Sequence, residues 1–134
     1  MATNKFNFDK VLRNFKNIDL SLDMANTAKN EFMNNFREQG FDGKRWNPRK
    51  NNKDSGRNLL VKTGRLRRDV SNSVNTGKKN SNLSYTLVVN NGYAIYNNEG
   101  TNKIPKRQFV GMTQTLNKKL LNKISQRISK IWET

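Results

Sequence analysis

The chain has 134 residues, which suffices for one domain with a small hydrophobic core. Lys and Arg number 26 against 10 Asp and Glu, so the formal net charge is +16, and Cys and His are both absent. Their absence excludes disulfides, thiol nucleophiles, Ser-His-Asp triads and metal sites built on Cys or His. No apolar stretch approaches the ~18 residues of a membrane span, and we expect neither a signal peptide nor a transmembrane segment.

Two helices are predicted at the start of the chain. The first covers about residues 6–16, where apolar side chains recur at i, i+3, i+4 and i+7, namely Phe8, Val11, Leu12 and Phe15. The second covers about residues 21–38, with Ser21 as N-cap and Gly40 at its end. Its apolar stripe consists of Leu22, Ala25, Ala28, Phe32 and Phe36. We expect the aromatic side chains of both helices to lie in the core.

An extended basic loop is predicted over about residues 41–58, because Asp, Gly, Lys, Arg, Pro and Asn dominate this segment and Trp46 is its only large apolar residue after Phe41. A polar loop of this length inside a compact domain is typically functional or disordered. We expect residues 44–57 to act as a clasp between neighbouring subunits.

A small antiparallel β-meander is predicted next, with its apolar face on the helices. A strand is expected over about 68–75, then a polar loop, then the clearest strand over 83–90, where large apolar side chains alternate. Asn91-Gly92 is a tight-turn signal, and the run 93–98 fits either a strand or a helical turn.

A long amphipathic helix is predicted over about residues 113–132. One face carries Leu116, Leu120, Ile124, Ile128 and Ile131, and the Lys residues lie largely away from that stripe. A domain helix with one buried and one solvated face is the preferred interpretation. A basic helix that binds nucleic acid or a membrane surface is the alternative.

No catalytic motif is present in the sequence. The acidic residues are scattered, without a close pair in a glycine-rich setting. Thr63-Gly64-Arg65 does not fit a phosphate-binding loop, and Gly40 and Gly43 do not fit a dinucleotide-binding fingerprint. No nucleic-acid-binding motif is found either. We therefore expect that the protein is not an enzyme and has no cofactor and no metal ion.

Four motif segments follow one another in a characteristic order. They read GFDGKRWNP (40–48), LLVKTGRLRRDV (59–70), YAIYNNEG (93–100) and IPKRQFVGM (104–112). This series resembles the phage virion morphogenesis family, the tail-completion or head–tail joining proteins of tailed bacteriophages. Asp69-Val70 and Asn97-Asn98 depart from the usual family pattern, but the Gly, Trp and Phe positions do not.

The resemblance and the predicted elements together imply a single α+β domain over residues 1–134. N-terminal helices, a small antiparallel sheet and a long C-terminal amphipathic helix would form it. The implied function is that of a structural protein of the bacteriophage neck, in a ring expected to be hexameric. This ring would complete the tail or join it to the DNA-filled head. Its partners would be copies of itself, head connector or adaptor proteins, and tail or tail-tube proteins. We expect it in the virion and, during assembly, in the host cytoplasm, without membrane contact.

The motif segments supply the candidate interface residues. We expect Gly64 and Gly100 to need positive φ or close approach, and Trp46 and Phe109 to fill hydrophobic gaps, either within the chain or between subunits. Arg65 and Arg107 would pair with carboxylates of the same or a neighbouring chain. The full set of interface candidates is Trp46, Pro48, Arg49, Lys50, Thr63, Gly64, Arg65, Leu66, Tyr93, Gly100, Pro105, Arg107 and Phe109.

The excess of positive charge leaves two kinds of contact open. Residues 1–40 hold six basic and five acidic side chains, whereas residues 41–134 hold 20 basic and five acidic ones. Such a field favours a polyanionic neighbour, either DNA in the channel or acidic partner proteins. The candidates are Lys44, Arg45, Lys53, Arg57, Lys118, Lys119, Lys123 and Lys130. The alternative function is a small basic nucleic-acid-binding accessory protein.

Overall fold

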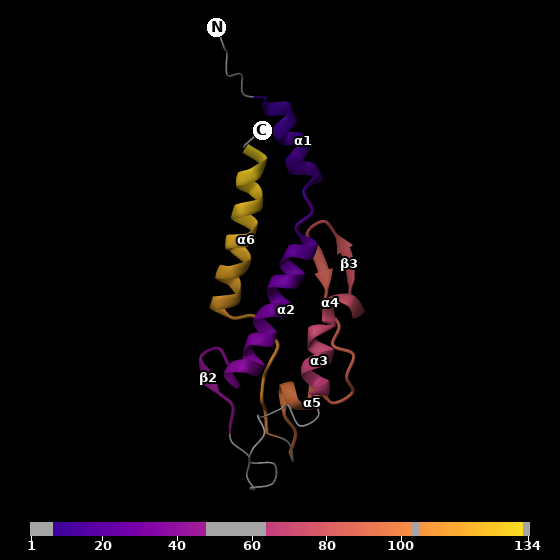
Figure 1. Ribbon diagram of the computed structural model, residues 1–134, viewed down its shortest axis with the longest axis vertical. Coiled ribbons are helices and arrows are strands. Elements are labelled where there is room, and N and C mark those ends of the chain that lie inside the picture. The colour runs from indigo at the N-terminus through magenta and orange to yellow at the C-terminus, as the bar shows by residue number, and fades with distance from the viewer. Residues whose placement is uncertain (1–6, 48–63, 103–104, 133–134) are drawn as a thin grey trace.

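Helix α2 (Ser21–Glu38) runs through the middle of an elongated molecule, and the other elements pack around it (Figure 1). The computed structural model describes residues 7–47, 64–102 and 105–132. Within them lie α1 (Phe8–Asn17), β1 (Gly40–Phe41), β2 (Lys44–Arg45), α3 (Arg65–Ser71), α4 (Ser73–Thr76), β3 (Lys78–Ser81), β4 (Ser84–Thr86), α5 (Ala94–Glu99) and α6 (Gln114–Trp132). The predicted α+β class, with N-terminal helices and a long C-terminal helix, is confirmed.

Helix α6 packs along α2, and two ion pairs link the helices. Lys119 pairs with Glu31, which is 9% exposed, and Arg127 pairs with Asp23. Arg127 also donates a hydrogen bond of 3.2 Å to the carbonyl of Asp19. The apolar stripe predicted for α6 faces inward, since Leu116 and Ile131 are buried.

The bounds of α2 agree with the sequence prediction, but its capping residues differ. Leu20 rather than Ser21 is the N-cap, and no side chain caps the helix from that position. Ser21 is buried as the first helical residue, and its backbone N–H and hydroxyl both donate to Oδ1 of Asp19. At the other end Gln39, with φ 57°, ends the helix in the left-handed conformation that was expected of Gly40.

The start of the predicted basic loop is a tight β-hairpin. β1 and β2 pair antiparallel, and Asp42 and Gly43 form the turn with φ of 53° and 77°. Two positive φ values are typical of a type I′ turn, for which Asp-Gly is a preferred sequence. Gly40 is required here, because a Cβ at this position would lie 2.4 Å from the carbonyl oxygen of Lys44. The rest of the predicted loop, from residue 48 on, lies outside the described residues.

The prediction of a strand over 68–75 is wrong, because this segment forms α3 and α4. Leu66 and Val70, both buried, are four residues apart, which is the spacing of one helical face rather than of a strand. The chain enters α3 through Gly64, whose φ of 70° confirms the expected positive value. Arg65 to Ser71 thus present Leu66 and Val70 to the core.

The strands form two separate hairpins rather than one continuous meander. The predicted strand 83–90 shortens to β4, and its partner β3 lies in the segment that was expected to be a polar loop. All four residues of β3 are exposed, so no apolar alternation marks it in the sequence. The run 93–98, for which two interpretations were open, forms α5.

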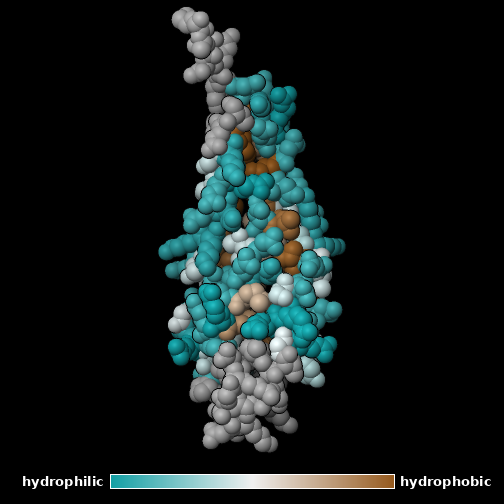
Figure 2. Space-filling model, in the orientation of Figure 1, coloured by the Kyte–Doolittle hydropathy of each residue, from teal (hydrophilic) through white to brown (hydrophobic). Residues whose placement is uncertain are grey.

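The aromatic side chains of α1 contradict the expectation that they lie in the core. Phe8 is 61% exposed and Phe15 is 47% exposed, whereas Val11 of the same helix is buried. Helix α1 lies beyond the end of α2 and packs against α6 (Figure 1). Most of the surface in Figure 2 is hydrophilic, with hydrophobic side chains in short strips between elements. No described helix is long and apolar enough to cross a bilayer.

Candidate assembly surface

A core cluster of five buried side chains brings parts of all four motif segments together at one end of the molecule. Its members are Phe36, Trp46, Leu66, Val70 and Phe109, with Ala94 of the third motif segment packed against it. The Phe36 ring meets Trp46 edge to face at 5.7 Å between centroids and Phe109 at 5.4 Å. Such aromatic contacts add to the burial of apolar area.

Hydrogen bonds fix the last motif segment to the others. The indole Nε1–H of Trp46 donates to the carbonyl of Gln108 at 2.7 Å. The side-chain amide of Asn35, on α2, donates to the carbonyl of Phe109 at 2.9 Å. The backbone carbonyls of Gln108 and Phe109 are therefore each bound by a side chain from another part of the chain, Trp46 and Asn35 respectively. These bonds satisfy polar groups that would otherwise be buried without a partner.

Asn98 holds the same segment from its other side. Its Oδ1 accepts hydrogen bonds from the backbone N–H of Phe109 at 3.0 Å and from that of Val110 at 3.2 Å. The carbonyl of Asn97 accepts from the Arg107 N–H at 2.8 Å. Asn97 and Asn98 thus join α5 to the last motif segment. We did not predict this role, and the only sequence signal is the departure itself.

Gly100 allows this junction to close. Its φ of 80° confirms the expected positive value, and a Cβ at this position would lie 2.9 Å from the backbone nitrogen of Lys106. Both the conformation and the close approach exclude larger residues without a local shift. Arg107 donates from Nε to the carbonyl of Asn47 at 3.0 Å, within the chain.

The predicted interface candidates divide into buried and exposed sets. Trp46, Leu66 and Phe109 are buried inside the single chain, where they hold the motif segments together. Gly64, Gly100, Pro105 and Arg107 are partly buried. Arg65 is exposed and lies 4.0 Å from Asp69 of the same helix. Outside the described residues lie Pro48, Arg49, Lys50 and Thr63, together with the basic candidates Lys53 and Arg57.

Three of the exposed apolar side chains belong to α5 and its N-cap. Tyr93 is 73% exposed, Ile95 58% and Tyr96 48%, while Ala94 between them packs against the core cluster. We call Tyr93, Ile95 and Tyr96 the α5 patch. Sequence reasoning selected Tyr93 but not Ile95 or Tyr96. The available sequence signal was Ala94, a small residue among three large ones. In a helix, Ala94 can pack against the core while its larger neighbours point to solvent.

The α5 patch sits on a rigid support. The side-chain amide of Asn91 donates to Asp69 on α3 at 2.9 Å, and its Oδ1 accepts from the Tyr93 backbone N–H at 2.9 Å. Large tyrosine and isoleucine side chains that are presented to solvent by a fixed backbone are typical of protein–protein contact sites.

The basic candidates are spread over two elements. Lys44 and Arg45 are exposed on β2, and Lys118, Lys123 and Lys130 are exposed on α6. Lys119 differs from them, because its ammonium is engaged by Glu31. The four α6 candidates therefore differ in role: Lys118, Lys123 and Lys130 are exposed to solvent, whereas Lys119 links α6 to α2.

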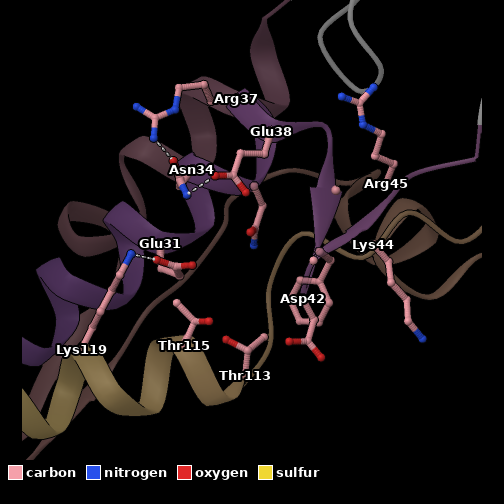
Figure 3. Close-up of a pocket in the computed structure, with 14 residues that line it drawn as sticks. Glu31, Asn34, Arg37, Glu38, Asp42, Lys44, Arg45, Thr113, Thr115 and Lys119 are labelled. Atoms are coloured by element: carbon pink, nitrogen blue, oxygen red, sulfur yellow. Dashed lines mark hydrogen bonds and ion pairs between the residues drawn. The ribbon is translucent and has the colours of Figure 1, made fainter.

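A polar groove of about 680 Å³ lies between α2, the β1–β2 hairpin and the start of α6 (Figure 3). Carboxylates of Glu31, Glu38 and Asp42 line it alongside the basic side chains of four residues, Arg37, Lys44, Arg45 and Lys119. In Figure 3 Glu31 and Lys119 meet across the groove. Charges of both signs make it a poor match for an anion, and among the described residues no cluster of His, Cys, Asp and Glu fits a metal ion.

Asp19, at the junction of α1 and α2, has a perturbed carboxyl group. Its hydrogen bond with the Lys79 ammonium, together with that from the Ser21 hydroxyl, lowers the pKa of Asp19 to about 2 from 3.8. The carboxylate therefore stays charged in the folded protein down to strongly acidic pH and ties the β3–β4 hairpin to the start of α2.

Comparison with known proteins gives no relative: no protein-family model, no curated protein and no solved structure matches the chain.

Proposed function

We propose that the chain is a structural subunit of a bacteriophage neck, which assembles into a ring and completes the tail or joins it to the head. The observation that carries the proposal is the order of the four motif segments, with GFDGKRWNP, TGRL, YA and IPKRQF in the sequence expected of that family. The convergence of these segments on one core cluster supports it, because motifs that lie far apart in the sequence then share one structural role.

The distribution of exposed apolar side chains also supports an assembly role. The α5 patch lies at the motif-bearing end, and Leu12 and Phe15 of α1 lie at the opposite end of the long axis (Figure 1). A joining subunit must contact both its own copies and other proteins, which requires at least two distinct surfaces. A ring forms when one surface of a subunit binds a different surface of the next and the rotation closes.

The α5 patch is the surface that we assign to contact between copies. An interface core enriched in Tyr with a central aliphatic side chain is typical of contacts that carry most of the binding energy. Exposed Arg65, at the start of α3, would add polar contacts at the rim.

Negative-stain electron microscopy of the purified chain tests this assignment. The wild type is expected to form rings, alone or on addition of connector or tail-tube protein. The variant Tyr93→Ser/Ile95→Ser is expected to remain monomeric with an unchanged circular dichroism spectrum, since both side chains are exposed. The matched control Leu121→Ser, whose side chain is 53% exposed on α6, should still form rings. Rings that form equally well with all three proteins would refute the α5 assignment.

A nucleic-acid-binding accessory protein is the second candidate. The net charge of +16 and the exposed Lys and Arg residues on β2 and α6 favour it. It gives no reason for the ordered motif segments, whereas a neck subunit that lines a DNA channel accommodates both observations. Phosphate contacts would then be independent of base sequence and sensitive to salt.

A further inference from the structure

Helix α1 presents an apolar face to solvent at the end of the molecule opposite the α5 patch. Leu12 is 43% exposed and Phe15 is 47% exposed, and they lie three residues apart on one side of the helix. Val11, at 4% exposure, lies on the side of α1 that packs against α6. The apolar stripe of α1 is therefore buried at its Val11 edge, whereas its Leu12 and Phe15 edge remains at the surface.

Helix α1 carries more basic than acidic side chains. Lys10, Arg13 and Lys16 of α1 are all exposed. Lys130 of α6 lines a shallow hollow beside α1 with Asn14 and Ile18. The only acidic residue within α1 is Asp9, and Asp19 just beyond the helix is bound to Lys79. Helix α1 thus has three basic side chains against one acidic side chain, and two of the basic ones, Arg13 and Lys16, flank the Leu12 edge of the apolar stripe.

We propose that this α1 face docks an acidic amphipathic helix of a partner protein. Its leucine-type side chains would cover Leu12 and Phe15, and its carboxylates would face Arg13 and Lys16, which flank the Leu12 edge of the stripe. Charge complementarity selects this occupant, because a second copy of the same basic face would bring like charges together. Recognition of a helix by apolar residues one turn apart is a recurring mode of protein binding.

A membrane surface fits the geometry less well. Helices that lie in a bilayer interface insert their whole apolar face, whereas the Val11 edge of the apolar stripe of this ten-residue helix is already buried within the protein. The docking proposal rests on the proposed neck function for one point only, namely that the acidic partner is another protein of the virion. The chemistry of the face is independent of that assignment.

Binding of a synthetic acidic helix tests the proposal. The probe is a labelled peptide of about three heptads with leucine at the a and d positions and glutamate at most others, which resembles one strand of a coiled coil. Fluorescence anisotropy with the full-length chain is expected to show binding that weakens with salt. Loss of two half-exposed apolar side chains in Leu12→Ser/Phe15→Ser is expected to weaken binding about tenfold or more.

Two further variants separate docking from other effects. Met112→Ser removes an apolar side chain that is 67% exposed outside α1, and it should bind the peptide like the wild type. Arg13→Glu/Lys16→Glu changes only exposed side chains, so it should fold normally, lose most of the binding and lose its salt dependence. Urea unfolding of every variant checks that the fold is retained.

Three results would overturn the proposal: no binding of the peptide by the wild type, equal binding by the wild type and Leu12→Ser/Phe15→Ser, or binding to phosphatidylserine-containing vesicles that depends on Leu12 and Phe15. Loss of ring mass in Leu12→Ser/Phe15→Ser would also overturn it, because α1 would then belong to the contact between copies. Peptide binding through α1 by a chain that never forms a ring would support the docking face and count against the neck assignment.

Discussion

Replacement of Asn98 by alanine should loosen the motif-bearing end of the molecule. The Asn98 Oδ1 accepts two backbone hydrogen bonds, from Phe109 at 3.0 Å and Val110 at 3.2 Å, and Phe109 is only 1% exposed. A buried N–H left without an acceptor costs about 1–3 kcal/mol, and the partly buried second one costs less. We therefore expect Asn98→Ala to lower the free energy of unfolding by about 2 kcal/mol.

The size of the chain converts this free energy into a measurable shift. An unfolding entropy of about 2.1 cal/mol/K per residue, for a domain of this length, makes ~2 kcal/mol equivalent to a decrease in Tm of about 7 °C. Urea unfolding and thermal scans should both report the change. The control Asn98→Asp keeps the accepting oxygen, so it should retain most of the stability.

The reasoning is refuted if Asn98→Ala unfolds at the same urea concentration as the wild type with an unchanged m-value. Equal losses in Asn98→Ala and Asn98→Asp would also contradict it, because the accepting oxygen would then not be the group that matters.

Three further predictions concern the groups that hold the fold. Trp46→Phe should lose about 1 kcal/mol in urea unfolding because the bond to the Gln108 carbonyl disappears, and Trp46→Ala about 3–5 kcal/mol. Gly100→Ala should destabilise by about 1–3 kcal/mol, since φ is 80° and the Cβ approaches Lys106, whereas Gly92→Ala, which meets nothing within 4 Å, should not. The pKa of Asp19 is lowered to about 2, so the stability that its charged form contributes is complete above pH ~4 and is lost as pH falls through 2. The free energy of unfolding, measured across this pH range, should therefore decrease less in Asp19→Asn than in the wild type.

The long helices could be predicted from the sequence because their apolar spacing extends over several turns. The bounds of α2 match the prediction, and α6 differs by one residue at its start. The ends could not be predicted as well. Gln39 rather than Gly40 adopts the left-handed conformation, since Gly40 is needed for close approach to Lys44 in the following hairpin. The preference of Gly for the left-handed conformation was therefore overridden here by the packing of Gly40 against Lys44.

The segment after Gly64 was misread because short elements carry little periodicity. Val70 and Val74, with a polar residue between them, satisfy both a strand and a helix, and only the buried Leu66 one turn earlier decides for the helix. The Asp42-Gly43 hairpin, by contrast, had a recognisable turn signal, which the surrounding polar composition obscured.

The candidate site was predictable in its residues but not in its geometry. Trp46 and Phe109 were selected as gap-filling side chains, and both are buried in one core cluster. Their hydrogen bonds span 62 residues to Gln108 and 74 residues from Asn35, and no local pattern specifies such partners. The exposure of Tyr93, Ile95 and Tyr96 likewise depends on the helical conformation of α5, for which the sequence left two interpretations open.

The mass of the assembled species tests the proposed neck function most directly. Light scattering would be recorded for the chain alone and with connector and tail-tube proteins of the same phage, at about 50 and 200 mM salt, with duplex DNA as a separate sample. A closed ring of defined mass, formed alone or with those partners at both salt concentrations, is the predicted result. A persistent monomer that ignores both proteins, yet binds DNA with an affinity that falls by orders of magnitude over this range, would contradict it.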